Sequence, residues 1–229
     1  MKPNNSIISD PLVAYDPYYE RFRRHVFTLL FIGYTHARNK NLDLAVAEED
    51  DITDHIVKGI EEYKKDLYSP AWVENYAIEQ QRPHSSHGEI GDRRKWLDIF
   101  FQGNRREQNN TFCFEAKRLY PGQKPKRYFG QKGMQQFLLR EYPTNPKGEA
   151  VMLGYVQSHD IQYWLQWLKT HFENFRADLH ISTDSSWDDF PIIPQLPYSF
   201  RTQHVPLSDI PVVLFHVLLS FVGDGSTVR

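Results

Sequence analysis

Cysteine is nearly absent from this sequence, and so are the long apolar runs that mark membrane proteins. Cys113 is the one cysteine among 229 residues, which excludes an internal disulfide and is typical of a reducing compartment. No basic-then-apolar stretch of the secretory kind opens the sequence, and no uncharged run is long enough to span a bilayer. We therefore expect a cytoplasmic protein that makes no membrane contact.

Overall positive charge, the usual sign of a nucleic-acid-binding protein, is also missing, because the formal net charge is -2 at pH 7. The charges are nevertheless unevenly placed, since residues 92–132 contain eleven Lys or Arg against four Asp or Glu. Such a basic segment suits binding to a phosphate backbone, although charges solvated in loops explain the pattern equally well. The candidate nucleic-acid contacts are Arg105, Arg106, Arg118, Lys124, Lys126 and Arg127.

The centre of the basic segment has the pattern of a β-hairpin. Residues 94–101 and 112–119 are rich in aromatic and branched side chains, and the ten residues between them are polar. If the hairpin closes symmetrically, Asp98 lies opposite Glu115, with their Cβ atoms roughly 5 Å apart. Because side chains alternate along a strand, Glu115 and Lys117 should share one face, while Phe114 and Ala116 point to the other.

Two carboxylates and an ammonium would then converge on one spot. Like charges that face each other in a sheet are destabilising, and a hard divalent cation with oxygen ligands would neutralise them. The alternative is the solvated face of an ordinary hairpin. The Glu-x-Lys triplet alone does not decide between them, because Glu62-Tyr63-Lys64 is a second instance within a helical pattern.

Asp98, followed across a hairpin by Glu115-Ala116-Lys117, resembles the active-site signature of the PD-(D/E)xK, or restriction-endonuclease-like, nuclease superfamily. The proline that names the family is missing near Asp98, where Trp96-Leu97 stands. The resemblance implies an α/β fold with a mixed central sheet, whose core runs helix, three strands, helix, strand. It also implies that Asp98, Glu115 and the Ala116 carbonyl hold Mg²⁺ or Mn²⁺, and that Asp98, Glu115 and Lys117 are catalytic.

The order of predicted elements over residues 48–157 follows that core. Acidic residues 48–51 open a helix with an apolar stripe at 52, 56, 60, 63 and 67. Glu49 continues the stripe and matches the acidic residue of the family's first helix, which makes it a fourth candidate metal ligand. Glu48 is equally in line by spacing, and the helix dipole alone explains either residue. We expect a strand over 72–80, the hairpin, a helix over 130–142 and a buried strand over 149–157.

The remaining segments are expected to extend this core within a single nuclease domain, residues 1–229, because the 40% hydrophobic composition suits one large core. An N-terminal helix over 16–38 should pack outside the catalytic core. The C-terminal extension, 158–229, should begin with an amphipathic helix capped by Asp160, followed by a loop over 184–197 and a strand over 198–204. Residues 210–222 fit a strand or a helix. Gln131 and Gln135 are further candidates near the site, while His204 and His216 are expected to be structural.

The sequence thus predicts a metal-dependent endonuclease that hydrolyses phosphodiester bonds, with DNA favoured over RNA. Restriction or phage defence is a role that the family suggests. Two alternatives remain open: an inactive nuclease fold that binds nucleic acid or regulates a larger complex, and an RNase on the same scaffold. A protein partner or a homodimer is equally open.

Overall fold

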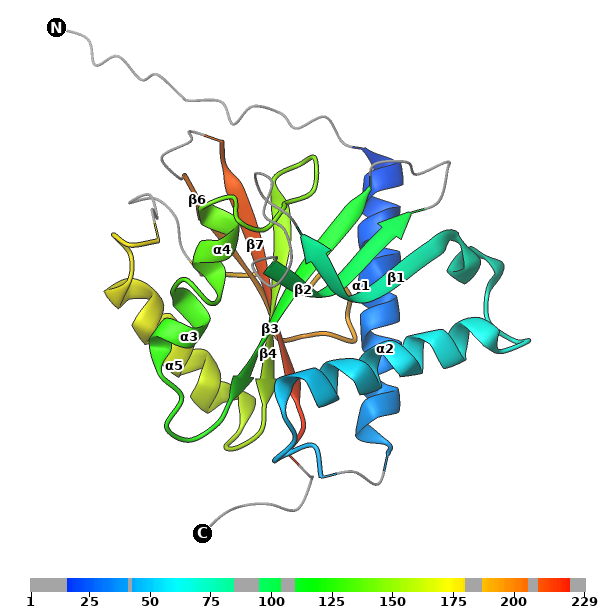
Figure 1. Ribbon diagram of the computed structural model, residues 1–229, viewed down its shortest axis with the longest axis horizontal. Coiled ribbons are helices and arrows are strands. Elements are labelled where there is room, and N and C mark those ends of the chain that lie inside the picture. Colours follow the sequence, from blue (N-terminus) through cyan, green and yellow to red (C-terminus); the bar gives the residue numbers. More distant parts are fainter. Residues whose placement is uncertain are drawn as a thin grey trace, which may run out of the picture.

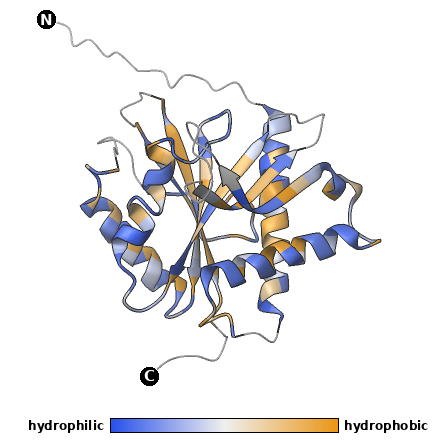
Figure 2. Ribbon diagram, in the orientation of Figure 1, coloured by the Kyte–Doolittle hydropathy of each residue, from blue (hydrophilic) through white to orange (hydrophobic). Residues whose placement is uncertain are grey.

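The computed structural model describes residues 16–40, 43–84, 95–103, 110–179, 187–205 and 210–222. These residues form an α/β structure in which helices cover both faces of one open, mixed sheet (Figure 1). The apolar colouring of Figure 2 is concentrated on the strands and on the middle of α1. No helix in these ranges is both long and apolar enough to cross a membrane.

The sheet has seven strands in the order β1-β2-β3-β4-β7-β6-β5. Strands β1, β2 and β3 are antiparallel, β4 is parallel to both β3 and β7, and β6 and β5 continue antiparallel. Strand β4 is buried along almost its whole length, as expected for a parallel strand covered on both faces. The strands are β1 (Tyr76–His84), β2 (Lys95–Gly103), β3 (Thr111–Leu119), β4 (Glu149–Val156), β5 (Asp188–Asp189), β6 (Ser199–His204) and β7 (Val212–Ser220).

Helices α1 (Pro17–Arg38) and α2 (Glu49–Lys65) cover one face of the sheet (Figure 1). The Asp16 carboxylate caps α1 by accepting hydrogen bonds from two backbone N–H groups of the first turn. The expectation that this helix packs outside the catalytic core is wrong, because Phe22 and Phe27 are fully buried against Phe112 of β3, the strand that also carries Glu115 and Lys117. Gly33 allows the two helices to touch, since a Cβ there would collide with the backbone of α2.

The opposite face is covered by α3 (Pro125–Phe129), α4 (Met134–Leu138) and α5 (Ile161–Asn174). The predicted helix over 130–142 is therefore wrong in extent. A Cβ at Gly133 would collide with backbone carbonyl oxygens of the preceding turn, so the chain bends tightly between two short helices. Most apolar residues of the segment 130–142 are nevertheless buried as expected. Asp160 caps α5, as expected, by accepting a hydrogen bond from the Tyr163 N–H at 2.7 Å.

The structure also differs from the predictions in three details and decides one segment that the sequence left open. Residues 71–75 form a 3-10 helix, η1 (Ala71–Asn75), so the first strand begins at Tyr76 rather than at 72. Leu67 does not extend the apolar stripe of α2, because it lies beyond the helix and is 97% exposed. The short strand β5 lies within the predicted loop over 184–197, and the ambiguous segment 210–222 forms β7.

A chain of hydrogen bonds is buried between β6, β7 and α3. The His204 Nδ1–H donates to the Leu179 carbonyl oxygen at 2.9 Å, which leaves Nε2 of a neutral ring to accept from Thr202. Thr202 then accepts from His216 Nε2 at 2.8 Å, and Tyr128 donates to His216 Nδ1 at 3.0 Å. Every polar group in this chain is satisfied with both histidines neutral. Burial lowers the pKa of His216 well below its ordinary value.

Candidate active site

The β2–β3 register is the predicted one. The ladder runs from the Gln102–Thr111 pair to the Ile99–Phe114 pair, and one further step places Asp98 beside Glu115. At this point the Asp98 side chain accepts a hydrogen bond from the Ala116 N–H at 2.6 Å. The Asp98 carboxylate is thereby tied to the strand that carries the Glu-x-Lys triplet.

Alternation along β3 sorts its side chains between the two faces as predicted. Phe114 and Ala116 are buried in the core under α1 and α2. Glu115 and Lys117 point to the other face, on the side of the short helices, where they are only 5% and 7% exposed. Two ionisable groups of opposite charge are therefore held nearly out of water on a central strand, which requires that they be paired.

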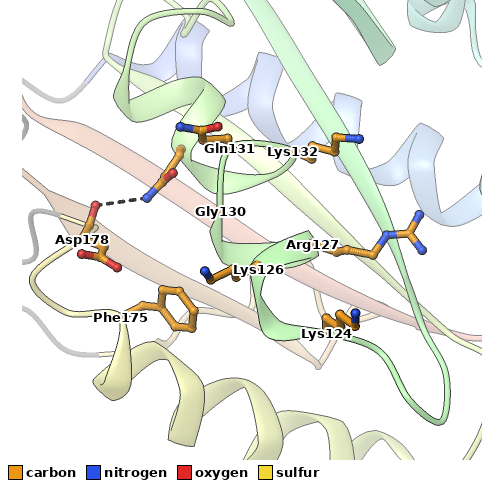
Figure 3. A pocket seen from close by; sticks show the side chains of 9 residues that line it. Lys124, Lys126, Arg127, Gly130, Gln131, Lys132, Phe175 and Asp178 are labelled. Atoms are coloured by element: carbon orange, nitrogen blue, oxygen red, sulfur yellow. Dashed lines mark hydrogen bonds between the residues drawn. The ribbon is translucent and has the colours of Figure 1, made fainter.

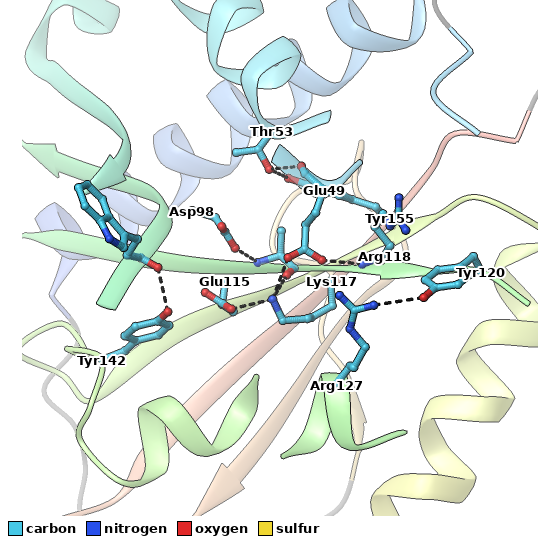
Figure 4. A network of polar contacts seen from close by, with 12 residues as sticks. Glu49, Thr53, Asp98, Glu115, Lys117, Arg118, Tyr120, Arg127, Tyr142 and Tyr155 are labelled. Carbon is cyan, nitrogen blue, oxygen red and sulfur yellow. Dashed lines mark hydrogen bonds and ion pairs between the residues drawn. The ribbon is translucent and has the colours of Figure 1, made fainter. Parts of the chain in front are cut away.

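The Lys117 ammonium is the centre of a polar network (Figure 4). Its Nζ lies 2.7 Å from Glu115 Oε1, 2.9 Å from Glu49 Oε1 and 2.5 Å from the Ala116 carbonyl oxygen. The other oxygen of Glu49 accepts from the Arg118 N–H at 3.1 Å. Two segments far apart in the sequence, the start of α2 and β3, therefore meet at one ammonium group.

Glu49 reaches this network because of how α2 begins. It is the first residue of α2, one turn before the buried Thr53, whose hydroxyl lies 2.9 Å from the Tyr155 hydroxyl in β4. Glu48 was equally in line by spacing, but its side chain is 75% exposed and pairs with Arg118. The inward direction predicted for Glu49 is what the structure has.

The electrostatics of the network follow from burial. Burial raises the pKa of Asp98 to about 6, although the Lys117 charge and the Ala116 N–H lower it. Burial and the Asp98 charge together raise the pKa of Glu115 well above its ordinary value. Burial alone would lower the pKa of Lys117, but the surrounding carboxylates raise it above its ordinary value. The site thus carries more negative charge than one ammonium compensates well.

No protein-family model, curated protein or solved structure matches this chain.

The network opens into a pocket of about 590 Å³. Glu49, Glu115 and Lys117 form part of its wall, and Gln136 and Tyr142 are two further wall residues that the sequence did not indicate. Gln136 is 7% exposed, and its amide oxygen has no hydrogen-bond partner among the described residues. No sequence signal could have found Gln136, because it lies off the apolar stripe of the expected helix.

The neighbouring residues Gln131 and Gln135, which were candidates by sequence, separate in the structure. Gln131 lines this pocket, and its carbonyl oxygen accepts a hydrogen bond from the Gln136 side chain. Gln135 instead donates to the Asp178 carbonyl oxygen at 3.4 Å and lines a different pocket. Burial and the nearby carboxylates raise the pKa of Tyr142, whose hydroxyl donates to the Trp96 carbonyl oxygen at 2.8 Å.

The residues present fit a hard divalent ion in their chemistry. Asp98, Glu115 and the Ala116 carbonyl offer oxygen ligands, and Glu115 Oε2 is buried without a hydrogen-bond partner in the described part of the chain. Within the same part of the chain, however, no three His, Cys, Asp or Glu side chains are grouped as a ready metal site. Lys117 contacts Glu115 and the Ala116 oxygen, so its ammonium stands in for a cation and must move for an ion to bind.

The predicted nucleic-acid contacts fall into three groups. Arg118 is engaged within the protein, because its guanidinium donates to the Ala47 carbonyl oxygen at 2.9 Å and pairs with Glu48 at 2.8 Å. The other cations that can be placed are exposed and line a second pocket, next to the first: Lys124, Lys126 and Arg127. Arg105 and Arg106 lie outside the described residues.

Proposed function

We propose that the protein is a Mg²⁺-dependent nuclease of the PD-(D/E)xK class that hydrolyses phosphodiester bonds, with DNA favoured over RNA. The observation that carries this proposal is the convergence of Asp98, Glu115 and Lys117 from two neighbouring strands. The Glu115 and Lys117 side chains are buried at the wall of a pocket, Asp98 accepts a hydrogen bond from the same strand, and the Ala116 carbonyl oxygen lies within the same network. The pKa values of both carboxyl groups are raised, as is common at catalytic sites.

The order of elements around the site supports the same class. Helix α2 precedes three antiparallel strands, two short helices follow, and β4 then lies parallel to β3. This order resembles the helix, three-strand, helix, strand core of the restriction-endonuclease-like class, with two short helices in place of one. Glu49 occupies the first residue of the first helix of that order and contacts the lysine.

Each residue of the site has a distinct role in this proposal. Asp98, Glu115 and the Ala116 carbonyl would hold the ion, which when bound polarises the scissile phosphate and lowers the pKa of the attacking water. Lys117 keeps its proton at neutral pH because carboxylates surround it, so we assign it to orienting the water and stabilising charge on the phosphate. Glu49 holds Lys117 in place, and it remains a candidate ligand once the lysine moves.

One observation favours a second candidate, a nuclease fold that binds nucleic acid without cleaving it. The Lys117 ammonium already pairs with Glu115 and contacts the Ala116 oxygen, so it fills part of the place of an ion. A regulatory or binding subunit would need no more than this arrangement and the basic surface beside it.

A substrate panel separates these functions. The protein is incubated with plasmid, linear duplex DNA, single-stranded DNA and RNA, each with Mg²⁺ and with EDTA. We expect cleavage of DNA with Mg²⁺ and none with EDTA. Cleavage of RNA alone would identify an RNase, and binding without cleavage of any substrate would support the inactive subunit.

A further inference from the structure

A second pocket, of about 530 Å³, lies between the α3–α4 segment and the end of α5 (Figure 3). Arg127, Gln131 and Lys132 line both this pocket and the acidic one. The two pockets are therefore adjacent, and a ligand that fills one can continue into the other.

The charge of this second pocket is strongly positive. Its wall includes Lys124, Lys126, Arg127 and Lys132, against a single acidic residue, Asp178. The four cationic side chains are exposed, and none of them forms a salt bridge within the described ranges. Cations without a salt-bridge partner attract phosphate, whereas the carboxylates of the neighbouring acidic pocket repel it. The second pocket is therefore the better place for a phosphate group.

An aromatic ring is the feature that phosphate binding alone does not explain. Phe175 lines the pocket beside the lysines (Figure 3). Its ring stacks on the fully buried Phe129, with centroids 5.7 Å apart and planes at 18°, and Phe129 in turn stacks on Trp167. The Phe175 ring is thus held in place by the core and can serve as a platform for a flat ligand.

Hydrogen-bonding groups complete the wall. The amides of Gln131 and Gln135 supply donors and acceptors, and the Asp178 carboxylate supplies an acceptor. Gln135 is tied to the Asp178 backbone by a hydrogen bond of 3.4 Å, which positions this side of the pocket. A cationic rim, an aromatic platform and edge-reading polar groups are together the parts of a nucleotide site.

We propose that this pocket is a nucleotide subsite, which binds the phosphate and the base of one unpaired nucleotide next to the acidic site. Bases of a duplex are stacked on one another, so only an unstacked base can lie against Phe175. The nucleic acid that reaches the acidic site therefore has an unpaired nucleotide at this position, as at an end, a flap, a gap or a locally unpaired stretch of a supercoiled plasmid. This inference rests on the proposed function.

The test compares single-stranded and duplex binding in EDTA, where no cleavage is expected. A fluorescent oligothymidylate and a duplex of the same length are titrated with the parent protein and with Phe175→Leu. We expect the variant to lose about tenfold in affinity for the single strand, the scale of one base–aromatic stack, and to keep its affinity for the duplex. Phe175→Tyr keeps the ring and should keep single-strand affinity. Phe190→Leu, a partly buried phenylalanine packed in the core under α1, is the matched control.

A competition experiment separates recognition of a nucleotide from recognition of charge. Thymidine monophosphate should displace the oligothymidylate at lower concentration than inorganic phosphate does. Equal competition by the two, or an equal effect of Phe175→Leu on single strand and duplex, would overturn the subsite.

The outcome is distinguishable from that of the nuclease proposal. Binding that depends on Phe175 without cleavage of any substrate would refute the nuclease and leave the subsite standing. Cleavage with Mg²⁺ and single-strand binding that ignores Phe175 would do the reverse.

Discussion

The cost of holding Asp98 ionised away from water can be measured by replacing it with its neutral isostere, Asp98→Asn. Its pKa rises from 3.8 to about 6 in the folded protein, and about two units correspond to about 3 kcal/mol of folding free energy. Because the folded-state pKa is raised, this stability is fully present below pH 3.8 and is lost as pH rises through about 6. Asparagine does not titrate, so the variant escapes that loss.

The amide oxygen of asparagine still accepts from the Ala116 N–H, although more weakly, at a cost of about 1 kcal/mol. Without Mg²⁺, Asp98→Asn should therefore be more stable than the parent by about 2 kcal/mol at pH 8. It should have no advantage at pH 4, where Asp98 is protonated in the parent. The measurement is urea denaturation in EDTA at both pH values.

The control is Asp54→Asn, which removes a carboxylate from an exposed pair with Lys58 and should change stability by less than about 0.5 kcal/mol. If Asp98→Asn were less stable than the parent at pH 8, or if its gain did not depend on pH, the carboxylate would not be electrostatically strained. The reasoning that assigns it a cation would then lose its basis.

Three other predictions concern the ion, the basic surface and the buried histidines. Added Mg²⁺ should raise the melting temperature of the parent and of Lys117→Ala but not of Asp98→Asn, because an ion that binds only the folded state stabilises that state. An equal shift in Asp98→Asn would mean that the Asp98 carboxylate does not bind the ion. Reversing the charges of three exposed cations, Lys124, Lys126 and Arg127, should reduce the slope of log affinity for DNA against log salt. An unchanged slope would mean that these charges are only solvated. The contribution of His216 to the unfolding free energy should fall as pH drops below about 6.5, because the unfolded chain gains a proton that the buried ring does not accept, and this contribution opposes that of the carboxyl groups with raised pKa values. In urea melts from pH 7.5 to 5, the unfolding free energy of His216→Asn relative to the parent should therefore rise with falling pH by up to about 1.4 kcal/mol per pH unit, and an unchanged pH dependence would mean that His216 charges when folded.

The parts of the site that could be predicted from sequence are those set by regular geometry. Strand alternation and symmetric closure of the hairpin place Asp98 next to Glu115, and the ladder has that register. The phase of the apolar stripe directs Glu49 inward, where it meets Lys117. Both predictions need only the side-chain period, two residues in a strand or 3.6 in a helix, and one residue whose direction is known.

The parts that could not be predicted depend on contacts between segments far apart in the chain. Nothing in the periodicity of residues 130–142 reveals the tight backbone turn at Gly133, so neither the two short helices nor the position of Gln136 was foreseeable. The same limit applies to α1, whose apolar stripe has the same pattern whether it packs on the central strands or outside them. Arg118 belongs to a basic segment by sequence, but Ala47 and Glu48, which lead into α2, lie close enough to β3 to engage it.

The most direct test of the proposed function is the rate of plasmid cleavage by Lys117→Ala at saturating Mg²⁺. The substitution removes no predicted ligand, so the ion should still bind, while loss of the charge that orients the water should slow cleavage by ~10² or more. Lys64→Ala is the matched control, because Lys64 also pairs with a glutamate, at 3.0 Å from Glu61, in the helical Glu-x-Lys triplet. We predict that Lys64→Ala cleaves at the parent rate and that Lys117→Ala cleaves about a hundredfold more slowly. Cleavage at the parent rate by both variants would contradict the account.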